Sequence, residues 1–197
     1  MGDTSPTNDY TRNMHLNINN KDEELRQHII EFLKDKPIQK LHAKQLLLEE
    51  GHTASNAYFI VKGLLRMFFY DKGRDISFQF FMENSIVSSF DSFYGNTPSM
   101  FYIESIEETE AIIINRNDFF RLLDSDIIVR KQFVEFLAAR FHVYQQLFLS
   151  RIKYTPAERY DELLRNYPEL LQRVPQHYIA SYLGITPVSL SRIRNRR

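Results

Sequence analysis

The residues best able to do chemistry gather at the C-terminal end of this 197-residue chain. Arg192, Arg194, Arg196 and Arg197 fall within six positions, and no acidic residue occurs from 174 to 197. A guanidinium group pairs with phosphate, and it can also donate two hydrogen bonds to one guanine. The pattern predicts a surface for a polyanion, with DNA as the first candidate and an unstructured basic tail as the alternative.

Two short helices joined by a tight turn are predicted just before these arginines. Gly184 stands where the turn needs a positive φ angle, and Ala180 leaves room for a second helix to cross closely. Thr186 and Pro187 are typical of an N-cap and a first helical position. With Leu190 and Ile193 pointing inward, the spacing indicates a DNA-binding helix-turn-helix. An ordinary helical hairpin is the alternative.

The second of these helices would lie in the major groove with its N-terminal half toward the bases. Ser189 and Arg192 could hydrogen-bond to base edges there, and Val188 could contact a thymine methyl group. The other polar and basic positions suit phosphate contacts, which fix orientation without reading sequence. The predicted DNA-binding residues are Gln176, His177, Thr186, Pro187, Val188, Ser189, Arg192, Arg194, Arg196 and Arg197.

A set of short strands is predicted upstream of this segment. Apolar runs rich in Phe, Tyr, Ile and Val alternate with turn signals such as Lys62-Gly63 and Asp71-Lys72-Gly73. Regular spacing of this kind favours an antiparallel sandwich or roll. The clearest strands are 58–61, 64–70, 76–81, 101–106 and 110–115, and a helix that starts near residue 20 and ends at Pro37 precedes them.

A long amphipathic helix is predicted from about residue 126 to 153, with Ser125 as its N-cap. At 1.5 Å per residue it would span about 42 Å, more than a small β domain needs as a cover. We expect it to pair with a second copy of the chain, and the alternative is that it covers its own β domain. The expected dimer residues are Phe133, Leu137, Phe141, Tyr144 and Phe148. A further helix starts at the Thr155-Pro156-Ala157-Glu158 capping box and ends near Pro168.

The net charge of zero hides an asymmetry along the chain. Residues 1–150 hold 16 basic and 21 acidic side chains, whereas residues 151–197 hold 9 and 4. An acidic body followed by a basic end indicates two modules, the second of which faces a polyanion.

Several classes of site are excluded by the residues that the chain lacks. It has no cysteine, hence no disulfide, cysteine nucleophile or cysteine-ligated cluster. The six histidines are scattered, without His-x-His spacing, so we expect neither a metal site nor haem. The six glycines form no phosphate-binding loop, and no Gly-x-Ser-x-Gly elbow occurs, so we expect no enzyme and no cofactor. With no long apolar run and no signal peptide, we expect a cytoplasmic protein without membrane contact.

From about Leu41 onward the chain resembles the Crp/Fnr family of bacterial transcription regulators. The resemblance rests on Leu46-Leu47-Leu48-Glu49-Glu50-Gly51, on residues 58–66 (YFIVKGLLR) and on the helix-turn-helix. It implies a cyclic-nucleotide-binding-like β-roll that senses an effector, a long dimerisation helix and a homodimer on a palindromic operator, with RNA polymerase as a further partner. The sequence leaves open which small molecule is the effector, or whether there is none. The alternative function is a ligand-binding or protein-interaction module whose helical hairpin does not bind DNA.

The expected ligand segment departs from the family pattern. Members that bind cyclic AMP have a Glu for the ribose and an Arg for the cyclic phosphate, and Ser88 and Pro98 stand at those positions here. Without that cation a cyclic phosphate would be desolvated against neutral donors, so we expect no cyclic AMP binding in the usual mode. Nearby aromatic side chains suit an apolar ligand or, as we favour, a self-filled core. The residues of this degenerate pocket are Ser88, Ser89, Tyr94, Pro98, Ser99 and Tyr102.

These observations predict an α+β fold in four segments. Residues 1–19 are a flexible arm, 20–125 an antiparallel, jelly-roll-like β-roll sensor, 126–153 the long dimerisation helix, and 154–197 an all-α helix-turn-helix domain with a minimal or absent wing.

Overall fold

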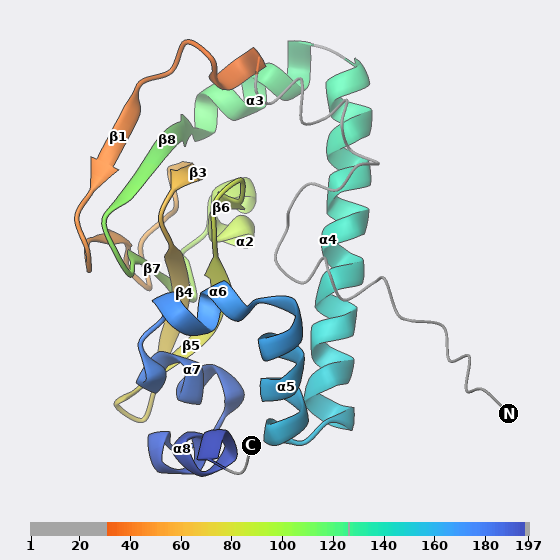
Figure 1. Ribbon diagram of the computed structural model, residues 1–197. Coiled ribbons are helices and arrows are strands. Elements are labelled where there is room, and N and C mark those ends of the chain that lie inside the picture. The colour runs from red at the N-terminus through yellow and green to blue at the C-terminus, as the bar shows by residue number, and fades with distance from the viewer. Residues whose placement is uncertain (1–30, 126, 196–197) are drawn as a thin grey trace, which may run out of the picture.

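The computed structural model describes residues 31–125 and 127–195. Eight antiparallel strands form two four-stranded sheets with the orders β1-β8-β3-β6 and β2-β7-β4-β5, and helices follow (Figure 1). The α+β prediction with an N-terminal β-roll is confirmed. The predicted arm, the start of the first helix, Arg196 and Arg197 lie outside the described residues. The strands are β1 (Ile38–Leu41), β2 (Leu46–Leu48), β3 (Asn56–Lys62), β4 (Leu65–Asp71), β5 (Arg74–Phe81), β6 (Ile86–Val87), β7 (Tyr102–Ser105) and β8 (Thr109–Asn115).

The turns that the glycines predicted join strands that are consecutive in the chain. Lys72 and Gly73 both have positive φ angles, as a two-residue hairpin between β4 and β5 requires. Gly63, with φ 109°, carries the chain from β3 to β4, and a Cβ built there would lie 2.7 Å from the Cα of Thr109. Aliphatic and aromatic side chains from both sheets fill the roll between them, among them Ile60, Leu65 and Phe81.

Three helices follow or interrupt the strands. The helix α2 (Phe90–Gly95) lies in the β6–β7 connection, α3 (Arg116–Ser125) follows β8, and α4 (Ile127–Lys153) runs down one side of the molecule (Figure 1). The prediction that Ser125 caps the long helix is wrong. Ser125 is the last residue of α3, and its hydroxyl donates to the Leu122 carbonyl (2.8 Å).

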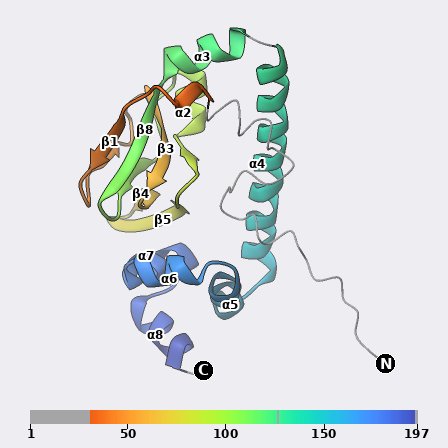
Figure 2. The same ribbon diagram turned by 45° about the horizontal axis from the view of Figure 1, so that its top comes forward.

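The C-terminal part contains four helices: α5 (Pro156–Asn166), α6 (Pro168–Arg173), α7 (Gln176–Leu183) and α8 (Pro187–Asn195). Thr155 and Glu158 form the predicted capping box at the start of α5. The sequence pattern does not predict α6, whose six residues are too few for a helical period. In both views α7 lies between the β-roll and α8 (Figures 1 and 2). Among the described residues no helix is both long enough and apolar enough to cross a bilayer.

The β-roll and the C-terminal helices share a hydrophobic core. Leu64 and Phe80 from the roll pack in one cluster with Ile179, Tyr182 and Leu183 of α7. Burying side chains from both parts in one cluster holds α7 against β5, so the orientation of the last two helices is tied to the sheet.

Candidate nucleic-acid interface and ligand pocket

The turn between α7 and α8 has the geometry that its residues predicted. Gly184 adopts the left-handed conformation (φ 71°, ψ 31°), and its N–H donates to the carbonyls of Ala180 and Ser181. The Ile185 N–H donates to the Ala180 carbonyl (2.9 Å). At the start of α8, Thr186 Oγ1 accepts from the Ser189 N–H (3.2 Å), as an N-cap does. The local sequence therefore fixes the angle at which α8 leaves α7.

One side of this helix pair is buried and the other is open. Ile179, Ala180, Leu183 and Leu190 are at most 2% exposed, whereas Val188 is 61% exposed. The other predicted contact residues within the described chain lie on the open side or at helix starts. Gln176, His177, Thr186, Pro187, Arg192 and Arg194 are exposed, and Ser189 is half-buried with its hydroxyl 3.0 Å from Thr186 Oγ1.

Two arginines that the sequence analysis did not single out hold the C-terminal end of α7. Arg151 donates to the Tyr182 carbonyl (3.2 Å), and Arg159 donates to the Leu183 carbonyl (2.7 Å). Cations at this end of a helix satisfy its last carbonyls and oppose the helix dipole. They attach the turn to α4 and α5, so its position depends on the long helix.

The opposite side of α7 is bonded to strand β5. The Ser77 N–H donates to Ser181 Oγ (3.0 Å), and the rings of Phe80 and Tyr182 pack 5.5 Å apart. The guanidinium carbon of Arg66 lies 3.6 Å from the centroid of the Tyr178 ring. A backbone hydrogen bond, a ring contact and a cation–π contact thus join the helix-turn-helix to the roll.

Arg66 is a buried cation with a full set of partners. It is 1% exposed, it donates to both carboxylate oxygens of Asp75 (2.5 and 2.6 Å), and it donates to Glu104 (2.6 Å) and Ser77 (3.2 Å). Burial lowers the pKa of Arg66, but the bonds to Asp75 and Glu104 outweigh it and hold the pKa above its ordinary value. The side chain stays charged and fixes β4, β5 and β7 beneath α7.

A second arginine ties the end of α6 to two loops of the roll. Arg173 donates to both oxygens of Glu83 (2.8 and 3.0 Å) and to Glu107. Glu83 also accepts from the Gly63 N–H (2.8 Å). Burial raises the pKa of Glu83, but the bonds from Arg173 and Gly63 outweigh it and leave the pKa below its ordinary value. We call these three side chains the Arg173 clamp.

The expected cyclic-nucleotide segment forms α2 and the loops on either side of it. Ser89 is buried and bonded to Ser99 (2.8 Å between hydroxyls), and Ser88 donates to the Asn56 carbonyl (3.1 Å). Tyr102 lies elsewhere, stacked on Phe68 in β4 with centroids 5.0 Å apart. The structure brings Ser88 and Ser89 to one cavity. Tyr94, Pro98, Ser99 and Tyr102 do not line it.

This cavity of about 430 Å³ lies between the roll and α4. It has the size of a small-molecule site, so the aromatic side chains do not fill this region completely. Asp91, Arg140 and Tyr144 are the polar groups on its wall besides the two serines. The apolar lining is Phe32, Ala57, Met67, Phe78, Phe81, Ile86, Phe90, Phe93, Phe101, Ile114, Phe119, Leu122, Leu123, Val129, Phe133, Phe136, Leu137 and Phe141.

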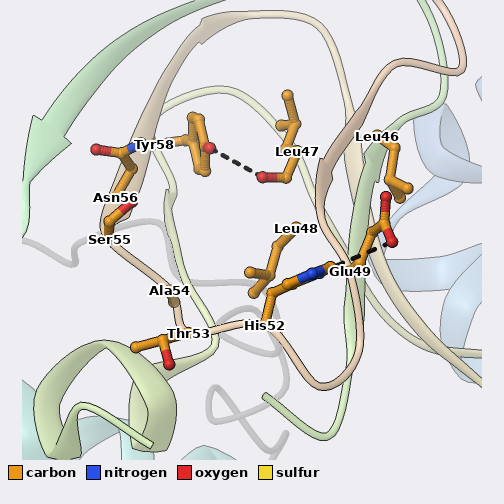
Figure 3. Close-up of a pocket in the computed structure, with 10 residues that line it drawn as sticks. All are labelled: Leu46, Leu47, Leu48, Glu49, His52, Thr53, Ala54, Ser55, Asn56 and Tyr58. Carbon is orange, nitrogen blue, oxygen red and sulfur yellow. Dashed lines mark hydrogen bonds and ion pairs between the residues drawn. The ribbon is translucent and has the colours of Figure 1, made fainter. Parts of the chain in front are cut away.

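A second, smaller pocket of about 280 Å³ lies between β2 and β3, and Figure 3 shows the residues that line it. Two contacts link its polar groups: the Tyr58 hydroxyl donates to the Leu47 carbonyl (3.3 Å), and His52 Nδ1 lies 3.7 Å from Glu49 (Figure 3). Nothing in this lining suggests a ligand chemistry. No group of three or more metal-ligating side chains occurs in the part of the chain that the structure describes.

The long helix α4 presents an exposed apolar row to solvent. Ile127, Val134, Phe141 and Phe148 recur every seven residues and are 60–74% exposed. Of the five expected dimer residues, Phe141 and Phe148 belong to this open row. Phe141 also contributes to the lining of the cavity. Phe133 instead packs on Phe119 (5.2 Å between centroids), because aromatic side chains of α2 and α3 reach that side of α4. Leu137 and Tyr144 also line the cavity.

Comparisons with known proteins point to one architecture. Residues 38–126 match the cyclic nucleotide-binding domain family. No curated protein matches the chain. Among solved structures, FixK2 from Bradyrhizobium japonicum is 19% identical (TM-score 0.64, covering 82% of this chain and 83% of that one). The c-di-GMP responsive global regulator CLP of Xanthomonas campestris is 12% identical (0.67, 87% and 90%), and the catabolite activator protein of Thermus thermophilus is 15% identical (0.52, 93% and 85%).

Proposed function

We propose that this chain, which has a cyclic nucleotide-binding domain over residues 38–126 and the fold of the Crp/Fnr regulators, is a sequence-specific DNA-binding transcription regulator that acts as a homodimer. The observation that carries the proposal is α8, which follows a tight turn and presents Val188, Arg192 and Arg194 outward. An open, acid-free helix after a fixed turn is what the major groove accepts. The neighbour CLP, which has a similar fold, is a global regulator, and this supports a regulatory role for the chain.

The residues of α8 divide between sequence reading and positioning. Arg192 and Ser189 face the bases in the proposed complex, with Val188 against a thymine methyl group. Thr186, Pro187, Gln176 and His177 stand at the two helix starts, where backbone N–H groups meet phosphate. Arg194, followed by Arg196 and Arg197, adds charge beside the groove and fixes register without reading sequence.

The exposed row on α4 supports the proposed homodimer. A spacing of seven residues returns to nearly the same side of a helix, so Ile127, Val134, Phe141 and Phe148 form one seam. Two copies joined along it would present two α8 helices related by a twofold axis. Such a dimer reads a palindromic operator with half-sites about 34 Å apart, and RNA polymerase would be its partner at a promoter.

The proposed segments follow from these roles. Residues 20–125 form the sensor, 126–153 the dimerisation helix and 154–197 the DNA-binding domain, after an arm over 1–19. Ser88 and Pro98 in place of a Glu and an Arg support a sensor that does not bind cyclic AMP in the usual mode. Calorimetry with cyclic AMP should show no saturable heat, and one micromolar site per protomer would contradict this part.

Selection of bound sequences from a random DNA pool tests the function directly. We expect an enriched palindrome, bound with an affinity that falls steeply as salt rises. In fluorescence anisotropy, Arg192→Ala should weaken the selected site by about 1–3 kcal/mol and relax one base position. The matched variant Arg194→Ala should weaken selected and random DNA alike. No enrichment, together with binding insensitive to salt, would refute the proposal.

A further inference from the structure

The wall that α4 gives to the cavity carries a cation without a counter-ion. Arg140 donates from Nη2 to the Tyr144 hydroxyl (2.9 Å), and its guanidinium lies 5.0 Å from the centroid of the Tyr144 ring. Its Nη1 atom is buried and has no hydrogen-bond partner among the described residues, none of whose carboxylates shifts the pKa of Arg140. Burial lowers the pKa of Arg140, as expected for a cation in an apolar surrounding.

A second unsatisfied donor lies beside it on the sheet. Gln79 of β5 is 1% exposed, and its Oε1 accepts from the Tyr144 hydroxyl (3.3 Å). Its Nε2 has no partner within the described chain. Gln79 pairs across the sheet with Met67, which lines the cavity, so both side chains lie on the cavity side of the sheet. Tyr144 thus joins two groups that each keep a free N–H.

The rest of the cavity is hydrophobic. Its lining consists of aromatic and aliphatic side chains except for Ser88, Ser89, Asp91, Arg140 and Tyr144. Asp91 is exposed and accepts from Ser89 (3.1 Å), and it is not among the groups that shift the pKa of Arg140. The ribose and base of a nucleotide would lose most of their hydrogen bonds in such a lining.

We propose that this cavity binds an amphipathic monocarboxylate, whose carboxylate bonds to Arg140 and whose apolar body lies among the phenylalanines. A half-buried guanidinium whose Nη1 atom is buried without a partner, and a buried amide N–H that is also unsatisfied, are costly without a ligand. A carboxylate satisfies a guanidinium with two parallel hydrogen bonds, and the apolar body gains by leaving water. The proposal deepens the proposed function by naming the chemical class of the effector. The role of the carboxylate as an effector rests on the proposed regulator function, whereas its binding in the cavity does not.

Binding is tested without DNA, by calorimetry on the full chain with decanoate and with decan-1-ol. We expect decanoate to bind at one site per protomer, and decanol to bind about 10- to 100-fold more weakly. Arg140→Gln should remove this preference by weakening decanoate alone. Arg130→Gln is the matched control, since Arg130 is on the same helix but pairs with exposed Asp124 outside the cavity.

Thermal unfolding of the same variants keeps the test independent of folding defects. Arg140→Gln removes a half-buried charge that has no carboxylate partner among the described residues, so the variant without ligand should melt no lower than the wild type. Decanoate should no longer raise the Tm of this variant. Arg140→Lys, which keeps a charge, should retain part of the decanoate affinity. Equal affinities for acid and alcohol, or unchanged decanoate binding in Arg140→Gln, would overturn the proposal. Selection of an operator from random DNA would then still support the regulator.

Discussion

The Arg173 clamp is the clearest place to test whether the C-terminal helices are held on the roll by charge. Arg173 is 27% exposed, and its partners Glu83 and Glu107 are 32% and 35% exposed. Arg173→Ala would remove hydrogen bonds to both carboxylates and leave two like charges facing the end of α6. Nothing else among the described contacts of the two glutamates replaces this cation.

The expected loss follows from the geometry. Charge-assisted hydrogen bonds to partly buried groups contribute about 1.5–3 kcal/mol, and the one-third exposure of the carboxylates places the clamp near the lower end. A loss of about 2 kcal/mol shifts the balance between docked and released helices roughly 30-fold toward release. The apolar contact of Phe80 with Tyr182 remains, so the helices should still dock most of the time.

Hydrogen exchange at the Ser77 amide reports this opening, because that N–H is bonded to Ser181 across the interface. In Arg173→Ala it should exchange roughly 30-fold faster, while amides inside β4 keep their wild-type rates. Arg74→Ala is the control, since Arg74 pairs with Asp71 at 71% and 45% exposure and should change stability by less than about 0.5 kcal/mol. Exchange at Ser77 within twofold of the wild type would show that apolar packing alone holds the interface.

Three further predictions concern stability at low pH, glycine substitution in the turns of the roll, and dimerisation. The pKa of Glu83 lies below its ordinary 4.5, so the contribution of Glu83 to stability is complete above pH 4.5 and is lost as the pH falls through the lowered pKa. Urea titrations should therefore show that the free energies of unfolding of the wild type and of Arg173→Ala become more similar in acid. Gly63→Ala places a Cβ 2.7 Å from a backbone atom of β8 at φ 109°, so it should lower the free energy of unfolding in urea by about 2–4 kcal/mol. The control Gly73→Ala, with open space around the new Cβ, should lower it by about 1 kcal/mol. Equal losses would refute the steric argument. Phe148→Glu places a charge in the exposed row on α4 and should give monomers in sedimentation velocity. The control Gln146→Glu, on another side of the helix, should remain dimeric. A dimeric Phe148→Glu chain would show that the dimer interface lies elsewhere.

The parts that could be predicted are those whose cause is local in sequence. Gly184, Thr186 and Pro187 act through the backbone of their own turn, so α7, the turn and α8 were readable without any tertiary contact. The alternating strands and the Lys72-Gly73 hairpin are of the same kind. Ser125 shows the limit, because a residue between two adjoining helices can end the first or start the second, and local preference does not choose.

The parts that could not be predicted depend on residues far apart in the chain. Arg173 meets Glu83 across 90 positions, and Ser181 meets Ser77 across 104. No period or spacing announces such a pair. The cavity could not be predicted for the same reason, since its volume depends on how far α4 lies from the roll. Aromatic composition alone favoured a filled core there, and it could not show that Arg140 would be left without a partner.

Strand β5 contacts both the cavity and α7, and this double contact matters for signalling. Phe78 and Phe81 line the cavity, while the Ser77 N–H and the ring of Phe80 contact α7. One strand, with no intervening loop, therefore forms part of the pocket wall and packs against α7, the first helix of the proposed DNA-binding unit. Thermodynamic reciprocity applies to any free energy exchanged across it: if an occupant of the pocket changes the affinity for an operator by some factor, the operator changes the affinity for that occupant by the same factor. Promoter DNA would then act as a ligand of the sensor.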